Sequence, residues 1–169
     1  MTQKTNSTFS HLECSKCGVK YSKTELHNLS PCCTLPLFPQ YDLEKAKSIL
    51  HKKDLKSRES NMWRYGEIMP VEFKENIISL GEGWTPLVQA NRLGELKGFS
   101  NLYLKNESIN PTGSFKDRGM SVAISKVKEF HLKNIAIPTA GNAGGSAAAY
   151  AAKAGQEAFI FMPNDTPKA

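Results

Sequence analysis

The sequence lacks any apolar run that approaches the roughly 20 residues needed to cross a lipid bilayer. Its first ten residues, MTQKTNSTFS, lack the apolar stretch of a secretory signal. It also has no internal repeat and no low-complexity segment. These absences argue against a membrane protein and a secreted protein, while 169 residues are enough for one core with a small appendage. We therefore expect a cytoplasmic globular protein with no membrane partner.

Aromatic residues are few, at 9% of the chain, and this matters because a net charge of +6 raises the question of a nucleic-acid partner. The positive excess is +4 in residues 1–60 and +2 in residues 61–169. Proteins that bind single strands place aromatic rings among their basic residues for base stacking, and residues 42–60 have no such ring. We therefore predict a solvated helix face and no nucleic-acid partner. The basic residues of this face are Lys45, Lys47, Lys52, Lys53, Lys56 and Arg58.

Cysteine is absent after residue 33, and all four cysteines lie in the first fifth of the chain, at Cys14, Cys17, Cys32 and Cys33. In a cytoplasmic protein such a cluster is more often metal-binding than disulfide-bonded. Residues 1–40 also contain several prolines and show little periodicity, which favours a small loop-rich module. Two interpretations stay open, a bound zinc ion and a reduced loop without metal.

Residues 42–60 are predicted to form a charged helix. Asp42 suits the N-cap position, because its carboxylate can accept from the first free N–H groups of a helix. The apolar stripe of this helix is formed by Leu43, Ala46, Ile49 and Leu50. From about residue 80 onward the pattern changes to alternating strands and helices.

This alternation is clearest after residue 100. A strand is predicted at residues 101–107, a turn at NPTG (110–113) and a helix over 114–132. The sequence then predicts a strand at 135–138, a glycine-rich turn at 141–145, a helix at 146–153 that Gly155 ends, and a strand at 158–162. A strand, turn, helix and strand within about 30 residues form a βαβ unit, which implies a parallel sheet. The expected fold class is therefore α/β.

The segment NPTGSFKDRG (110–119) places Lys116 in the first turn of a predicted helix. The positive end of the helix dipole disfavours the protonated form of an amine at that point. A neutral amine is what Schiff-base formation with a carbonyl group requires. Taken alone, however, the spacing fits an ordinary solvent-facing lysine better.

The segment TAGNAGG (139–145) follows a predicted buried strand and opens a helix, so its N–H groups are suited to binding an anion. Asn142 tolerates unusual backbone dihedrals, and its amide can donate to a ring oxygen or a carboxylate. The alternative is a tight turn whose glycines serve close packing. A nucleotide site is disfavoured, because the spacing is not G-x-G-x-x-G.

Together, SLGEGWTPL (79–87), NPTGSFKDRG (110–119) and PTAGNAGG (138–145) resemble the three successive motifs of fold-type II pyridoxal-phosphate (PLP) enzymes. The resemblance continues to the end of the chain, so it covers roughly residues 79–169. Three motifs in the right order and spacing make it highly specific. It implies part of the three-layer, parallel-sheet fold of those enzymes.

The resemblance also implies roles for particular residues. Lys116 would hold PLP and move protons, Asn142 would bond the ring hydroxyl of the cofactor, and Ser114 would shape the cofactor pocket. A helix-capping hydroxyl is an equally good interpretation of Ser114. The carboxylate of the amino-acid substrate would bind the N–H groups of the segment formed by Thr139, Ala140, Gly141, Asn142 and Ala143.

Within these enzymes, the motifs resemble those of the threonine synthase family at three positions, which are Phe115, Met120 and Ala143. Cysteine synthases usually have valine before the lysine, and dehydratases usually have alanine after K-x-R-G and a histidine after the G-N pair. The resemblance implies a PLP-dependent lyase that converts O-phospho-L-homoserine and water to L-threonine and phosphate. The alternatives are a serine or threonine dehydratase, and a zinc-ribbon binding module with a degenerate PLP scaffold.

Threonine synthase-like proteins often begin with a zinc-ribbon-like segment, which the Cys14 and Cys17 pair resembles. The departure is the adjacent pair Cys32 and Cys33, although both can still reach one tetrahedral ion. His11 or His27 are alternative ligands. We therefore expect a zinc-ribbon-like segment at 1–41, a linker helix and lead-in at 42–78, and a PLP-binding domain at 79–169.

The end of the chain carries a further expectation. Thr166 suits a helix N-cap and Pro167 suits the first helical position, so the sequence stops where a helix begins. We therefore expect a truncated catalytic domain that is inactive alone. An oligomer is compatible with the full-length protein.

Overall fold

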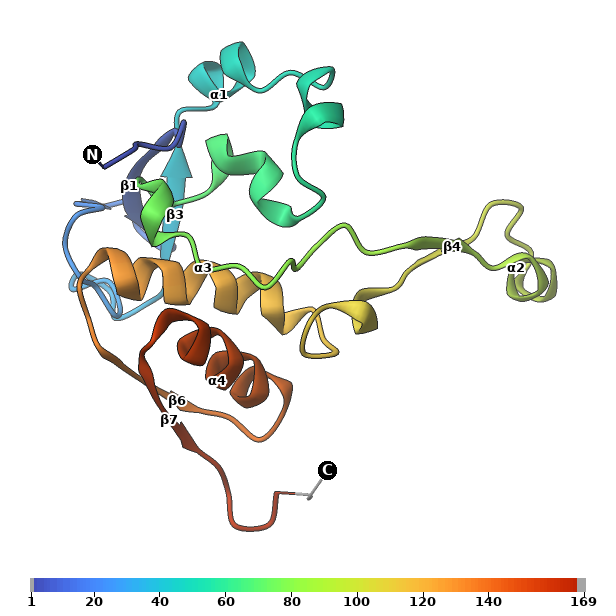
Figure 1. Ribbon diagram of the computed structural model, residues 1–169. Coiled ribbons are helices and arrows are strands. Elements are labelled where there is room, and N and C mark those ends of the chain that lie inside the picture. Colours follow the sequence, from blue (N-terminus) through green and yellow to red (C-terminus); the bar gives the residue numbers. More distant parts are fainter. Residues whose placement is uncertain (1, 167–169) are drawn as a thin grey trace. The chain divides into compact units, whose positions relative to one another are not determined.

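The computed structural model (Figure 1) describes residues 2–166. These residues divide into two compact units. Unit 1 comprises the residues up to 59 together with 63–77 and 125–132. Unit 2 comprises residues 60–62, 78–124 and those from 133 onward. The helix start expected at the end of the chain involves Pro167, which lies outside the described residues.

Unit 1 contains a three-stranded antiparallel sheet in the order β2-β1-β3. The strands are β1 (Phe9–Cys14), β2 (Lys20–Tyr21) and β3 (Leu37–Tyr41). Leu12 of β1 lies opposite Tyr21 on one side and Pro39 on the other. The loop-rich pattern of residues 1–40 did not predict this sheet, because the strands are short and one contains a proline that interrupts any alternation.

The charged helix predicted over residues 42–60 is wrong in its length. α1 spans Leu43–Ile49, and the Asp42 side chain caps it by accepting from the N–H of Lys45 at 2.9 Å. Leu50 is extended, and only a short 3-10 helix, η1 (Asp54–Ser57), follows. The apolar stripe ends at Leu50, and residues 51–60 contain one aliphatic side chain, Leu55, which is too few to bury a further run of helix. Two more 3-10 helices, η2 (Met62–Ile68) and η3 (Lys74–Asn76), follow before residue 78.

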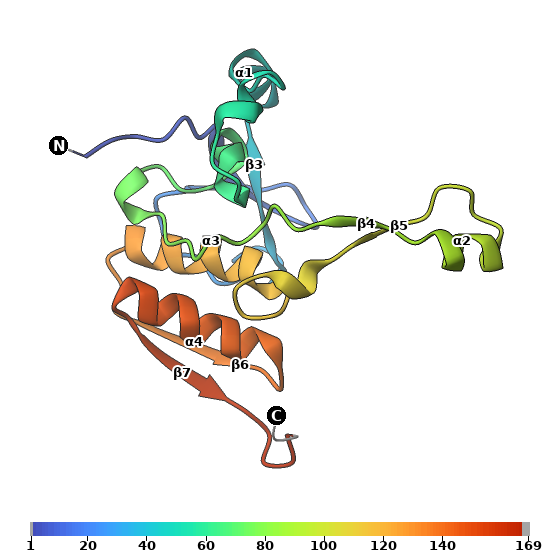
Figure 2. The ribbon, with the colours of Figure 1, turned by 45° about the vertical axis from the view of Figure 1, so that its right-hand side comes forward.

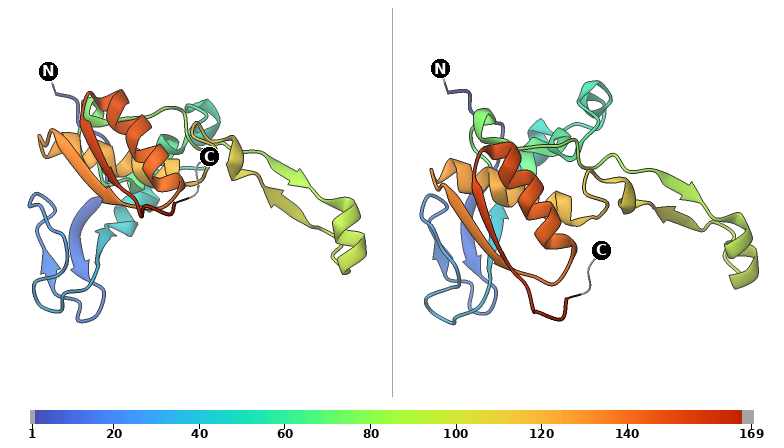
Figure 3. Two further views of the ribbon diagram at one scale, coloured as in Figure 1. Left: turned by 90° about the horizontal axis from the view of Figure 1, so that it is seen from below. Right: turned by 60° about the horizontal axis from the view of Figure 1, so that its bottom comes forward.

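Unit 2 begins with a two-stranded antiparallel ribbon of β4 (Leu87–Gln89) and β5 (Tyr103–Lys105). Figure 3 shows that the ribbon carries α2 (Asn91–Lys97) at its tip. Gly98 ends α2 with a φ of 74°, a left-handed conformation that glycine adopts without steric cost. The predicted strand at 101–107 is confirmed in its centre, and a 3-10 turn, η4 (Glu107–Ile109), begins at its last residue.

The predicted βαβ unit is confirmed in unit 2. β6 (Asn134–Pro138) and β7 (Glu157–Phe161) are parallel, and α4 (Asn142–Ala154) connects them and covers one face of the pair (Figure 2). The other face leaves Phe159 and Phe161 exposed, at 51% and 62%. α4 begins four residues earlier than predicted, so the glycines after Asn142 lie inside the helix and the turn is shorter than the sequence suggested.

The helix α3 (Lys116–Glu129) starts two residues later and ends three residues earlier than predicted, and its residues up to Ile124 belong to unit 2. Ile124 from α3 packs with Ile78, Tyr150 and Ala151 in the buried core of this unit. No helix among the described residues is long and apolar enough to cross a membrane.

Candidate functional site

Lys116 is the first residue of α3 and therefore lies in the first turn of the helix, as the sequence predicted. Ser114 is buried, and its Oγ accepts from the N–H of Lys116 at 3.1 Å, so this hydroxyl caps the helix start. The Lys116 side chain is exposed, and its Nζ lies 4.6 Å from the centre of the Phe115 ring. The structure therefore presents an exposed lysine side chain on a fixed helix start, while contact of Ser114 with a cofactor stays a prediction.

The turn from β6 to α4 holds the residues predicted to bind the substrate carboxylate. The N–H of Thr139 donates to Phe161 at 2.9 Å, and the hydroxyl of Thr139 accepts from Gly141 at 3.3 Å. Ala140 follows in the turn, and Asn142 and Ala143 are the first two residues of α4. No side chain in the described part of the chain caps α4, so its first N–H groups are suited to an anion.

The glycines of this turn differ in what surrounds them. A methyl group added at Gly141 or Gly145 would meet no atom within 4 Å, so a ligand can approach the backbone there. A methyl group at Gly144 would lie 2.9 Å from Ile160 and 3.0 Å from Thr139, so this glycine allows close packing of α4 on β7. Close packing therefore explains Gly144, while anion binding at Gly141 and Gly145 stays a prediction. The amine of Lys116 and this open turn provide the two kinds of group that PLP and an amino acid need.

Three carboxylates that the sequence analysis did not single out join the motif segments of unit 2. Asp117 is fully buried and accepts from Ser146 of α4 at 2.6 Å and from the N–H of Thr112 at 2.7 Å. Glu82 is also fully buried and accepts from the Tyr150 hydroxyl at 2.7 Å. Burial and this hydrogen bond raise the pKa of Tyr150, which keeps the phenol protonated.

Glu107 is the third carboxylate of this set. The guanidinium of Arg118 donates to it through Nε at 2.7 Å and Nη2 at 2.8 Å, and the Thr85 hydroxyl donates at 2.6 Å. These donors, Arg118 above all, lower the pKa of Glu107 to about 2. Nothing in the sequence indicates that these acids are buried or paired, because most acidic residues are exposed.

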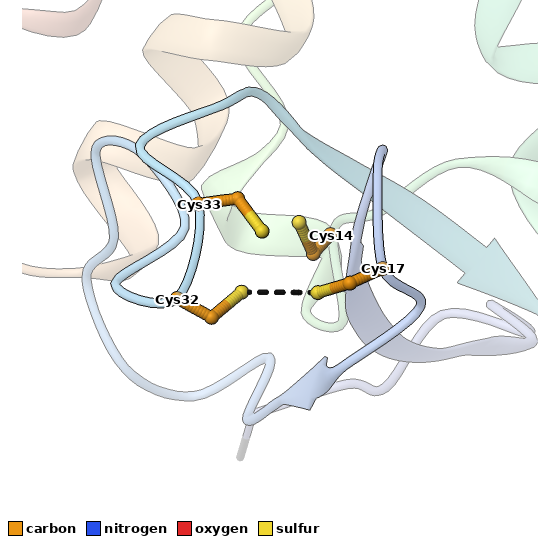
Figure 4. Close-up of side chains that lie close together, drawn as sticks. All are labelled: Cys14, Cys17, Cys32 and Cys33. Atoms are coloured by element: carbon orange, nitrogen blue, oxygen red, sulfur yellow. Dashed lines mark hydrogen bonds between the residues drawn. The ribbon is translucent and has the colours of Figure 1, made fainter.

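The four cysteines of unit 1 converge, and Figure 4 shows their side chains pointing toward one another. Their Sγ atoms all lie within 4.8 Å of one another, and those of Cys17 and Cys32 are 3.2 Å apart. Tetrahedral zinc with bonds of about 2.3 Å needs sulfurs about 3.8 Å apart, so small adjustments would complete such a site. The adjacent pair Cys32 and Cys33 therefore reaches the same point from one loop.

The alternative ligands lie outside this group. Among the described residues, the cluster of metal-ligand atoms contains the four cysteines and neither His11 nor His27. The ring of His27 instead lies 3.2 Å from the Ser22 carbonyl and packs edge-on against Tyr21. Cys14 is buried, and its thiol donates a hydrogen bond to the Ser30 hydroxyl at 3.3 Å. This hydrogen bond orients the sulfur of Cys14 toward the other three.

Known proteins that are similar in sequence to this chain indicate the same kind of site as the geometry of unit 2. A family description, "Pyridoxal-phosphate dependent enzyme", matches residues 78–169. The threonine synthase of Methanocaldococcus jannaschii is 40% identical over 150 residues, which are 89% of this chain and 37% of that protein. The threonine synthase of Methanosarcina acetivorans is 38% identical over 153 residues, which are 90% of this chain and 37% of that protein. The threonine synthase of Halalkalibacterium halodurans is 41% identical over 108 residues.

The family match covers the segments that contain Lys116 and the turn before α4. The chain spans 37% of the length of the two archaeal relatives. The family match covers more than half of the chain, and it includes Lys116 at the start of α3 and the turn before α4. The chain belongs to the pyridoxal-phosphate dependent enzyme family.

Proposed function

We propose that this chain is the lysine-bearing part of a threonine synthase, a PLP-dependent lyase that converts O-phospho-L-homoserine and water to L-threonine and phosphate. The observation that carries the proposal is the exposed amine of Lys116 on a capped helix start, in the same unit as the uncapped turn before α4. The similarity to relatives named threonine synthase supports this reaction over other PLP chemistry.

Each group of the site has a part in this proposal. PLP, when bound, withdraws electrons from the α-carbon of an amino acid and so makes its proton acidic. Lys116 would hold the cofactor and then, as a free amine, move protons to and from the substrate carbons. The N–H groups of Ala140, Asn142 and Ala143 would bind the substrate carboxylate, whereas those of Thr139 and Gly141 already donate to the Phe161 carbonyl and the Thr139 hydroxyl. The Asn142 amide would donate to the cofactor ring hydroxyl.

We also propose finer features of the fold. The parallel pair β6 and β7, with α4 on one face and exposed phenylalanines on the other, supports a sheet that is covered on both faces in a three-layer arrangement. The four converging thiols and the small antiparallel sheet of unit 1 support a zinc-ribbon-like segment with a structural zinc ion.

The central test is to identify the lysine that binds PLP. In the full-length gene product, borohydride reduction should fix PLP irreversibly on Lys116, and Lys116→Ala should remove both the fixed PLP and its absorbance. Lys105→Ala is the matched control, because Lys105 lies in β5 of the same unit, and it should retain PLP on Lys116. PLP fixed on another lysine would show that the assignment is wrong.

A second assay separates the reactions. Phosphate release from O-phospho-L-homoserine is the expected activity, and keto-acid release from serine or threonine would identify a dehydratase instead. Zinc binding without any fixed PLP would favour the non-enzyme alternative, a binding module on a degenerate scaffold.

A further inference from the structure

Asp117 is a buried carboxylate directly beside the exposed lysine of the candidate site. It is the second residue of α3, and its exposed fraction is 0%. A carboxylate persists in such a place only where hydrogen bonds replace its water shell. The groups that donate these bonds therefore show what Asp117 holds together.

The donors to Asp117 come from two separate segments. The N–H of Thr112, in the turn before α3, donates to Oδ2 at 2.7 Å, and the Thr112 hydroxyl donates to Oδ1. The hydroxyl of Ser146 donates to Oδ1 at 2.6 Å. Ser146 is fully buried and lies one helical turn after Asn142 in α4. One carboxylate thus joins the turn before Lys116, the start of α3 and the start of α4.

This connection has a consequence for Lys116. The side chain of Lys116 is long, flexible and exposed, so the position of its backbone sets the region that its amine can reach. The anion-binding N–H groups lie at the start of α4 and move with that helix. A displacement of about 1 Å between two reacting groups can cost about 10²-fold in rate. The bond between Asp117 and Ser146 resists such a displacement.

We infer that Asp117 is a positioning residue, a role that rests on the proposed function of Lys116. Through Ser146 it fixes the start of α4, and with it the anion-binding turn, relative to the lysine. It touches neither substrate nor cofactor in this role. The carboxylate acts through the two helix starts that it joins.

The test uses the full-length gene product with four variants. Asp117→Asn and Ser146→Ala each remove the charged hydrogen bond between the helices, and the double variant removes both partners. Ser121→Ala is the matched control, because Ser121 is a buried hydroxyl of the same helix that donates to the Ile78 carbonyl at 2.7 Å. Ser146→Ala keeps both bonds from Thr112, so it remains informative if Asp117→Asn fails to fold.

In turnover, we expect each single variant to lower kcat by about 10- to 100-fold with a smaller change in KM. Displacement of the two helix starts reduces the stabilisation of the transition state more than it reduces substrate binding. The double variant should lose no more than the worse single variant, since both remove the same bond. In cofactor-free protein, hydrogen–deuterium exchange should become faster at 110–117 and at 139–146. Ser121→Ala should leave exchange at 139–146 unchanged.

Two results would overturn this role: losses in kcat that multiply in the double variant, or unchanged exchange at 139–146 in both single variants. Borohydride reduction of the unaltered protein distinguishes the two levels of failure. If PLP is fixed on Lys116 but the variants behave like Ser121→Ala, only the role of Asp117 is wrong. If PLP is fixed elsewhere, the proposed function fails, and the exchange data still decide whether Asp117 and Ser146 hold the two helices together.

Discussion

Glu107 connects three segments of unit 2 through one carboxylate. It accepts from Arg118 of α3, from Thr85 before β4 and from the Asn110 amide at 2.9 Å. Because these donors favour the charged form, the pKa of Glu107 falls from 4.5 to about 2. The stabilisation is therefore fully present above pH 4.5 and is lost as the pH falls from there toward 2.

Glu107→Gln should therefore lower the free energy of unfolding at pH 7 by about 1–2 kcal/mol, a value kept small because both partners are partly exposed. The difference from the unaltered protein should shrink as the pH falls from 4.5 toward 2. Urea denaturation at a series of pH values measures it. Glu95→Gln on α2, an exposed acid, is the control and should change stability little. An equal loss for Glu107→Gln at pH 7 and near pH 2 would contradict the pKa argument.

At the scale of elements, the packing of α4 on β7 depends on Gly144. A Cβ there would lie 2.9 Å from Ile160 and 3.2 Å from Met162, so in Gly144→Ala either these side chains or the helix must shift. Gly145 is the matched control, because a Cβ there meets open space and alanine favours a helix by about 1 kcal/mol. We expect Gly144→Ala to destabilise by about 1–3 kcal/mol and Gly145→Ala to stabilise slightly, both measured by thermal unfolding. Changes of the same sign in both variants would show that packing is not what Gly144 serves.

The sequence predicted those elements whose signal is local. Asp42 as an N-cap, Gly155 as a helix end and the βαβ unit from 134 to 161 are all confirmed. The β4–β5 ribbon and α2 were not predicted in full, because strands of three residues carry too little alternation to stand out. The helix over 42–60 was predicted too long, because charged residues favour helix formation even where no apolar stripe remains.

For the candidate site, the sequence predicted which segments carry the site residues but not the hydrogen bonds that join these segments. Lys116 lies in the first turn of a helix, as its motif indicated, whereas Asn142, predicted in the turn, is the first residue of α4. The roles of Glu82, Glu107 and Asp117 depend on long-range contacts, such as the one from Glu82 to Tyr150, 68 residues away. A single sequence does not show which acidic residues find donors in the folded chain, so these three carboxylates became visible only in the structure.

At the scale of the whole molecule, the compact units are discontinuous in sequence, since residues 125–132 belong to unit 1 and residues 133 onward to unit 2. Composition along the chain suggests contiguous segments, and the functional division at 41/42 and 78/79 stays a prediction. The cysteines and the PLP motifs lie in different units, so the proposed zinc and the proposed cofactor can be tested independently.

Protein purified without chelator should contain about one zinc ion per chain, because four thiols lie within 4.8 Å of one another and zinc prefers four sulfur ligands. Cys14→Ser should lose the ion, whereas Ser15→Ala, at the exposed neighbouring position, should retain it. Since metal binding and folding are coupled, chelation should speed hydrogen exchange in β1 and β3 of unit 1. Exchange in β6 and β7 should not change, because these strands form their sheet in the other unit. Protein that contains no zinc, and whose exchange is the same with and without chelator, would instead establish the reduced, metal-free loop.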